Sequence, residues 1–94
     1  MTMTEFPNSY QEICPSGEID IATAGAAFDS AQIRHQAEQI TVDLSRVTFI
    51  DAAGLGALVR LRNDLMAAGG DLRLAGVHAR HARLFVIGGL GSLL

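Results

Sequence analysis

The segment VDLSRVTFIDAAGLGAL, residues 42–58, changes character halfway along. Its first half is apolar and contains β-branched residues, a composition typical of a buried strand. Its second half starts at Asp51 with small residues and then places Leu55 and Leu58 at a spacing typical of one helix face. A strand that leads through small residues into a helix N-terminus is a common way to build a site on an α/β scaffold. We therefore expect a site where this helix begins.

The residues before this segment predict one strand and one helix. The strand is expected within Tyr10–Ile19, either at the edge of a sheet or broken at Pro15, because proline cannot donate to a sheet ladder. The helix is expected over Ile21–Gln39 with Thr23 as its N-cap, or with a later start near Asp29.

The later residues continue the alternation of strands and helices. The expected elements are strands at Ile40–Leu44 and Asp71–Ala75, a further apolar strand segment at Val47–Ile50, and helices at Ala52–Ala68 and His78–Ile87. Alternation of this kind predicts an α/β layer, with a mostly parallel or mixed sheet of about four strands flanked by three to four helices.

Length and composition indicate one small globular domain. The chain has 94 residues, of which 49% are hydrophobic and 18% charged, and this balance argues against disorder. We expect the domain to occupy residues 10–94, and residues 1–9 to form a flexible tail or an edge segment.

Net charge and the length of the apolar runs argue against nucleic-acid binding and membrane insertion. The formal net charge is -3, so nucleic acid is not an expected partner. No apolar run reaches the roughly 18–20 residues that a membrane span needs, so membrane insertion is not expected. The first ten residues lack the basic start and apolar centre of a signal peptide. The expected location is the cytoplasm.

The glycines after the strand could suggest a nucleotide site. A dinucleotide fingerprint starting at Gly54-Leu55-Gly56 needs glycine or alanine at position 59, which is Val59. The turn also lacks the Lys-Ser/Thr ending of a phosphate-binding loop. Neither a nucleotide nor another cofactor is expected.

Metal and thiol chemistry have little support in the sequence. His78 and His81 lie three residues apart on an expected helix, but a metal site would need further ligands, such as His35, whose spacing gives no support. Cys14 is the only cysteine, and its apolar neighbours suggest a buried small residue. We expect no metal site.

Catalytic groups are also lacking. None of the five serines occupies the small-x-Ser-x-small turn of a nucleophile elbow. Glu18 and Asp20 are two residues apart on an expected loop, and no apolar pocket is evident that would shift their pKa values. We do not expect an enzyme, which leaves a surface for another protein as the interpretation of the helix start.

Several motifs, in order, resemble the signature of the STAS domain, the fold of bacterial anti-sigma factor antagonists. The central segment resembles the family's strand, which ends in Asp-Ser-Ser/Thr-Gly-Leu-Gly and a helix. The other matching motifs are GEIDIAT at residues 17–23, AAGGDLRLAGV at 67–77 and RLFVIGGLGSLL at 83–94. The resemblance covers nearly the whole chain from about Tyr10 onward and implies a STAS-type α/β fold.

The resemblance also implies a function and one departure from it. Family members bind a serine kinase-like anti-sigma factor and so release the sigma factor that it holds. The kinase phosphorylates the hydroxyl residue directly before the conserved glycine, and the added charge resets the switch. That position is Ala53 here, and the family serine before it is Ala52. Since neither has a hydroxyl, the usual phosphorylation switch cannot operate at this turn.

The partner-binding residues follow from the same resemblance. Loops at one end of parallel strands converge, so the GEIDIAT loop should lie beside the helix start. Asp51 would cap or orient that start, although an N-cap with no role in partner binding is the alternative. The implied binding residues are Asp20, Thr23, Asp51, Ala52, Ala53, Gly54 and Leu55.

Two further questions about partners stay open at this point. The segment DLSRV is also compatible with the small STAS subunits of bacterial lipid-transport ABC complexes, which bind the ATPase. The chain could also pair with itself as a homodimer. The sequence does not identify the anti-sigma factor or the sigma factor.

Overall fold

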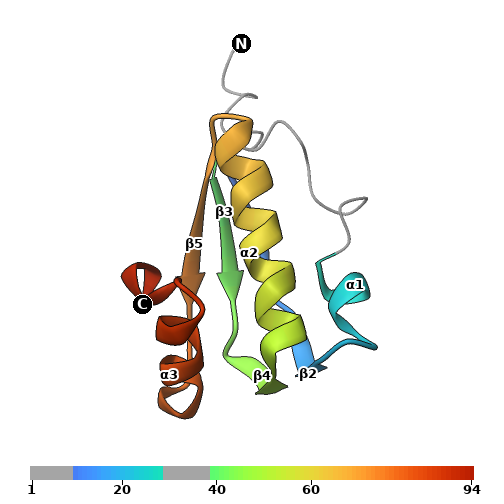
Figure 1. The fold of residues 1–94 in the computed structure, drawn as a ribbon. Helices are drawn as coiled ribbons and strands as arrows, with labels where there is room; N and C mark the ends of the chain where they lie inside the picture. The colour runs from blue at the N-terminus through green and yellow to red at the C-terminus, as the bar shows by residue number, and fades with distance from the viewer. Residues whose placement is uncertain (1–9, 29–38) are drawn as a thin grey trace.

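The computed structural model describes residues 10–28 and 39–94, and residues 1–9 and 29–38 lie outside the description (Figure 1). Each helix of the described chain follows one strand or a pair of consecutive strands, and a short 3-10 helix comes last. In order, the elements are β1 (Tyr10–Ile13), β2 (Ser16–Ile19), α1 (Ala24–Ala27), β3 (Gln39–Asp43), β4 (Arg46–Ile50), α2 (Ala52–Ala67), β5 (Asp71–Ala75), α3 (Ala79–Ile87) and the 3-10 helix η3 (Gly91–Leu93).

The strands form two parallel sheets. One has the order β1-β3-β5 and the other pairs β2 with β4. In the first sheet Ile40 lies opposite Gln11 on one side and Leu72 on the other, and in the second Ile19 lies opposite Ile50. Only two residues separate β1 from β2, and two separate β3 from β4. The second sheet therefore continues the first beyond a break in both strands.

The fold class expected from the sequence is confirmed, with more strands and fewer long helices. The described residues contain five strands rather than about four, because both strand runs are divided. The expected strand over Tyr10–Ile19 breaks at Cys14–Pro15, and β1 lies at a sheet edge. The long helices are α2 and α3, and α1 has four residues.

The expected helix over Ile21–Gln39 is wrong at both ends. Residues 21–23 form a turn, and Gln39 is already the first residue of β3. Local hydrogen bonds explain the first difference, because Asp20 and Thr23 bind nearby backbone groups and offer an alternative to the helix. The alternative start near Asp29 lies outside the described residues.

An aliphatic core fills the space between the sheets and the helices. Ile40 and Val42 of β3 and Leu72 of β5 are fully buried. Helix α2 packs along the sheet (Figure 1). Leu58 of α2 and Phe85 of α3 are also fully buried. Burial of each such side chain contributes about 1.5–3 kcal/mol. The core thus holds α2 and α3 in fixed positions relative to the strands.

Cys14 is exposed and not buried as its apolar neighbours suggested. It lies in the break between β1 and β2, beside Pro15, where the chain leaves the first sheet. Separately, none of the helices among the described residues is long and apolar enough to cross a bilayer.

Candidate protein-binding site

The first turn of α2 is capped by the carboxylate of Asp51. Its Oδ1 atom accepts hydrogen bonds from the backbone N–H of Ala53 at 3.0 Å and of Gly54 at 3.1 Å. These N–H groups have no partner inside the helix, so the carboxylate satisfies them and favours the helix dipole. The expected N-cap role of Asp51 is confirmed.

Gly54 allows α2 to lie directly against the ends of β2 and β4. A Cβ atom at this position would stand 2.5 Å from the carbonyl oxygen of Ile19, 2.8 Å from its Cγ2 and 3.0 Å from Cγ1 of Ile50. Such distances are closer than carbon contacts allow, so any side chain here would force the helix away. The backbone N–H of Asp51 also points to the Ile19 carbonyl, at 3.4 Å. The helix start and the end of β2 are therefore one packed unit.

The loop after β2 is fixed by its own polar groups. Oδ1 of Asp20 accepts hydrogen bonds from the backbone N–H of Ala22 at 2.9 Å and of Thr23 at 3.1 Å. The Thr23 hydroxyl donates to the carbonyl of Glu18 at 2.6 Å and accepts from the N–H of Asp20 at 2.9 Å. Thr23 is the N-cap residue of α1, as predicted, but its side chain makes no capping hydrogen bond to the helix.

This fixed loop exposes a large apolar side chain. Ile21 is 86% exposed, although it sits between the tethered residues Asp20 and Thr23. Ile21 comes two residues after Ile19, and the carbonyl of Ile19 lies against the first turn of α2. The sequence interpretation missed Ile21 because it placed this residue in a helix. The available signal was a carboxylate followed three residues later by a threonine, a pattern typical of local turns.

The structure divides the expected binding residues into a surface group and a buried group. Ala52 is exposed and Ala53 is half-buried at the start of α2. Gly54 and Leu55 are buried, and Leu55 is only 6% exposed. The last two therefore support the surface from beneath. We call Asp20, Ile21, Thr23, Asp51, Ala52 and Ala53 the docking corner.

A second junction joins the β3–β4 turn to the segment before α3. The N–H of Leu44 donates to the carbonyl of Ala75 at 2.8 Å. Gly76 has a φ of +67°, and a Cβ there would lie 2.7 Å from Oδ1 of Asp43 and 2.9 Å from Ser45. The N–H of Ser45 donates to Oδ1 of Asp43 at 2.9 Å, and this bond lowers the pKa of the Asp43 carboxyl.

The histidines of α3 belong to this junction. Nε2 of His78 lies 2.9 Å from the carbonyl oxygen of Ser45. A carbonyl can only accept, so Nε2 carries the proton. The ring of His81 meets that of His78 edge-on, with centroids 5.8 Å apart. Burial and then the charge of Arg80 lower the pKa of His81. No three potential metal ligands gather anywhere in residues 10–28 and 39–94.

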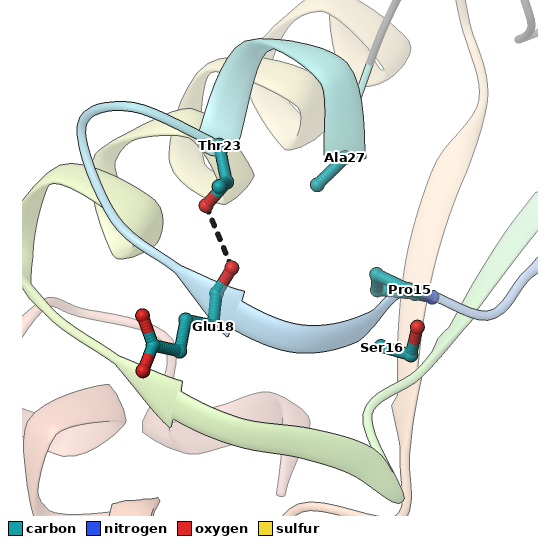
Figure 2. Close-up of a pocket in the computed structure, with 5 residues that line it drawn as sticks. All are labelled: Pro15, Ser16, Glu18, Thr23 and Ala27. Carbon is teal, nitrogen blue, oxygen red and sulfur yellow. Dashed lines mark hydrogen bonds between the residues drawn. The ribbon is translucent and has the colours of Figure 1, made fainter.

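A hollow of about 490 Å³ lies between β2 and α1 (Figure 2). Thr23 and Ala27 border it on the α1 side, and Pro15 and Ser16 border it at the start of β2. The dashed line in Figure 2 is the bond from Thr23 to the Glu18 carbonyl. The Thr23 hydroxyl already forms hydrogen bonds within the protein, so this hydroxyl is not free to bind a ligand in the hollow.

The fold and the corner define a small α/β domain with parallel strands and an exposed helix start. The family model for the STAS domain matches residues 7–94. The chain therefore belongs to the STAS domain family.

The chain is similar to a curated protein and to two solved structures of known class. The chain is 33% identical over 85 residues to a protein of Listeria monocytogenes named anti-sigma-B factor antagonist, covering 88% of this chain and 75% of that protein. The unphosphorylated anti-sigma factor antagonist SpoIIAA superposes with a TM-score of 0.77 at 20% identity, over 90% of this chain and 77% of SpoIIAA. The STAS domain of a Vibrio cholerae SulP transporter superposes with a TM-score of 0.72 at 19% identity, over 93% of this chain and 69% of that domain. The two structural likenesses concern the fold.

Proposed function

We propose that this chain is an anti-sigma factor antagonist that binds a kinase-type anti-sigma factor through the docking corner. It acts by binding and not by catalysis, and it releases a sigma factor by occupying the anti-sigma factor. The name of the Listeria relative supports the class of partner. The observation that carries the proposal is the exposed start of α2, capped by Asp51 and flanked by Ile21.

The corner suits a protein partner because it is rigid and partly apolar. Five hydrogen bonds that involve the Asp20 or Thr23 side chain fix the loop before binding, so little conformational entropy is lost. Ile21 can enter an apolar pocket of the partner, as central anchors of protein interfaces do. At the helix start beside it, the Asp51 carboxylate offsets the partial positive charge of the helix dipole.

The proposal includes the absence of a phosphorylation switch at this corner. Ala52 and Ala53 have no hydroxyl, and the Thr23 hydroxyl is held between Glu18 and Asp20. A phosphate at a helix start would add about -1.5 to -2 charge, and this chain has no acceptor for it there. We propose that binding is constitutive and controlled by the amount of protein present.

Binding to purified candidate anti-sigma factors tests the function. Isothermal titration would compare wild type with Ile21→Asp and with the matched control Met66→Asp. Ile21 and Met66 are both exposed, at 86% and 52%, so neither change should disturb the fold. Met66 lies about 20 Å along α2 from Ala52, given a rise of about 1.5 Å per residue.

We expect Ile21→Asp to weaken binding by about 30-fold or more, since truncated interface anchors cost about 2 kcal/mol or more. Met66→Asp should bind as wild type does. Equal weakening by both variants, or none by Ile21→Asp, contradicts the docking corner. Absence of wild-type binding to any candidate contradicts the function itself.

The alternative partner is the ATPase of a lipid-transport ABC complex. The fold likeness to a transporter domain does not favour it, because the same fold occurs in SpoIIAA. A parallel titration with the transport ATPase separates the two. If binding heat is measured with the ATPase and with none of the anti-sigma factors, the chain is a subunit of the ABC complex and not an anti-sigma factor antagonist.

A further inference from the structure

Strand β5 forms one edge of the three-stranded sheet. It pairs with β3, and no second strand pairs with it in the described part of the chain. Figure 1 shows β5 as the outermost strand, with η3 beside it. Asp71–Leu74 line a hollow of about 270 Å³ together with Ser92 and Leu93. An edge of this kind can accept another strand, since its outward backbone groups are not used by the sheet.

Two observations identify which residues turn their backbone groups outward. The Ala75 carbonyl accepts a bond from Leu44, so Ala75 faces the β3 side. Backbone groups alternate along a strand, so Arg73 and Asp71 face β3 as well, and Leu72 and Leu74 face the outer edge. The N–H of Leu72 agrees with this, because it donates to Oδ1 of Asp71 at 2.8 Å.

The exposed side chains of β5 carry opposite charges two residues apart. Asp71 and Arg73 are both exposed, whereas Leu72 between them is fully buried. Antiparallel pairing of two copies about Leu72 places Asp71 of one copy opposite Arg73 of the other, twice. These positions are non-hydrogen-bonded pairs, in which Cα atoms approach to about 4.5 Å and side chains lie close.

Other registers lack this match. Pairing about Arg73 would set two arginines face to face, which is destabilising. Pairing about Leu74 would place Asp71 opposite Val77 and Arg73 opposite Ala75, with no charge pair. Charge complementarity therefore selects a second copy of this chain, in one register.

We propose that two copies of this chain associate through antiparallel pairing of their β5 strands about Leu72. The N–H of Leu72 then donates to the carbonyl of Leu72 of the partner subunit. Asp71 gives up its bond to Leu72 and pairs with Arg73 of the partner subunit. The interface is separate from the docking corner and does not depend on the proposed function.

Sedimentation equilibrium over a concentration series, at low salt to limit screening, tests the proposal. Wild type should show a monomer–dimer equilibrium. Arg73→Asp should weaken the dimer at least about tenfold, because it creates two like-charge pairs. It leaves the bond between Leu72 and Asp71 in place, so the strand should fold normally. Arg60→Asp on α2 changes the net charge equally and should leave the dimer unchanged.

A charge exchange makes the test specific. Asp71→Arg alone should weaken the dimer in the same way, but mixed with Arg73→Asp it restores both opposite-charge pairs, so the mixture should associate more strongly than either variant alone. If Asp71→Arg fails to fold by circular dichroism, the comparison of Arg73→Asp with Arg60→Asp decides the result.

Three results overturn the proposal. They are a wild type that stays monomeric across the series, an Arg73→Asp dimer as strong as wild type, and a mixture of folded charge variants that does not associate. Weakening of a complex with the anti-sigma factor by Arg73→Asp, without any self-association, would assign the edge to that protein.

Discussion

The two long helices begin in opposite ways. The start of α2 has a carboxylate cap, since Asp51 accepts bonds from two backbone N–H groups. The start of α3 has no side-chain cap and no acidic residue in its first turn. It carries Arg80 and His81 instead, and positive charge near a helix N-terminus is unfavourable.

The start of α2 is stabilised by its own N-cap residue, whereas the start of α3 depends on a contact with another segment. The start of α2 satisfies two of its backbone N–H groups through Asp51 and packs on Ile19 through Gly54. The start of α3 is held from outside by the contact between His78 and Ser45. We therefore expect the first to respond to packing changes and the second to pH.

The largest expected effect is at Gly54. Gly54→Ala places a methyl group 2.5 Å from the Ile19 carbonyl, so we expect a loss of at least about 3 kcal/mol or failure to fold. Gly56→Ala is the matched control, because its nearest contact would be 3.9 Å away. It should be neutral or stabilising by up to about 1 kcal/mol, as alanine favours a helix interior. Urea unfolding measures both, and equal effects would contradict the close packing.

Loss of the α2 cap should have a smaller effect. Asp51→Ala should lower the free energy of unfolding by about 1 kcal/mol, and Asp51→Asn should retain most of the stability because asparagine also caps. The measurement is urea unfolding at neutral pH. An Asp51→Ala protein as stable as wild type would mean that the carboxylate does not support the helix.

The smallest expected effect is the pH dependence of the α3 start. The pKa of His81 lies below its ordinary value of 6.5, because of burial, Arg80 and His78. Just below pH 6.5 the unfolded chain therefore binds more protons at His81 than the folded chain does. The contribution of neutral His81 to the free energy of unfolding is complete above pH 6.5 and is lost as the pH falls from 6.5 through the lower pKa of the folded state.

The histidine can be tested by substitution. We expect wild type to lose more stability between about pH 8 and pH 5 than His81→Gln does, because glutamine has no proton to gain. Urea unfolding at both pH values measures the difference between the two proteins. A wild-type loss equal to that of His81→Gln contradicts the assignment.

The same contrast explains how far the sequence could predict the molecule. Helix α2 could be predicted from an apolar stripe that includes Leu58 and Leu65, both of which are buried. Strand β5 could be predicted from the alternation of polar and apolar residues in DLRLA. These are periodic signals, and the structure confirms them.

The loop of the docking corner had no periodic signal. Its geometry depends on single hydrogen bonds of Asp20 and Thr23, which a helical pattern extending from residue 21 concealed. The exposure of Ile21 followed from that geometry. The burial of Leu55 depends on how α2 packs, which the helix pattern alone does not fix.

The central claim is that the docking corner binds its partner without a phosphorylation switch. The most direct measurement incubates wild type and Ala53→Ser with the bound anti-sigma kinase and ATP, and follows phosphate incorporation by intact mass and complex dissociation by titration. Wild type should gain no phosphate and should keep its affinity. Ala53→Ser should gain one phosphate at position 53 and lose affinity. Phosphate on wild-type Ser45 or Thr48, followed by release of the kinase, would contradict the claim.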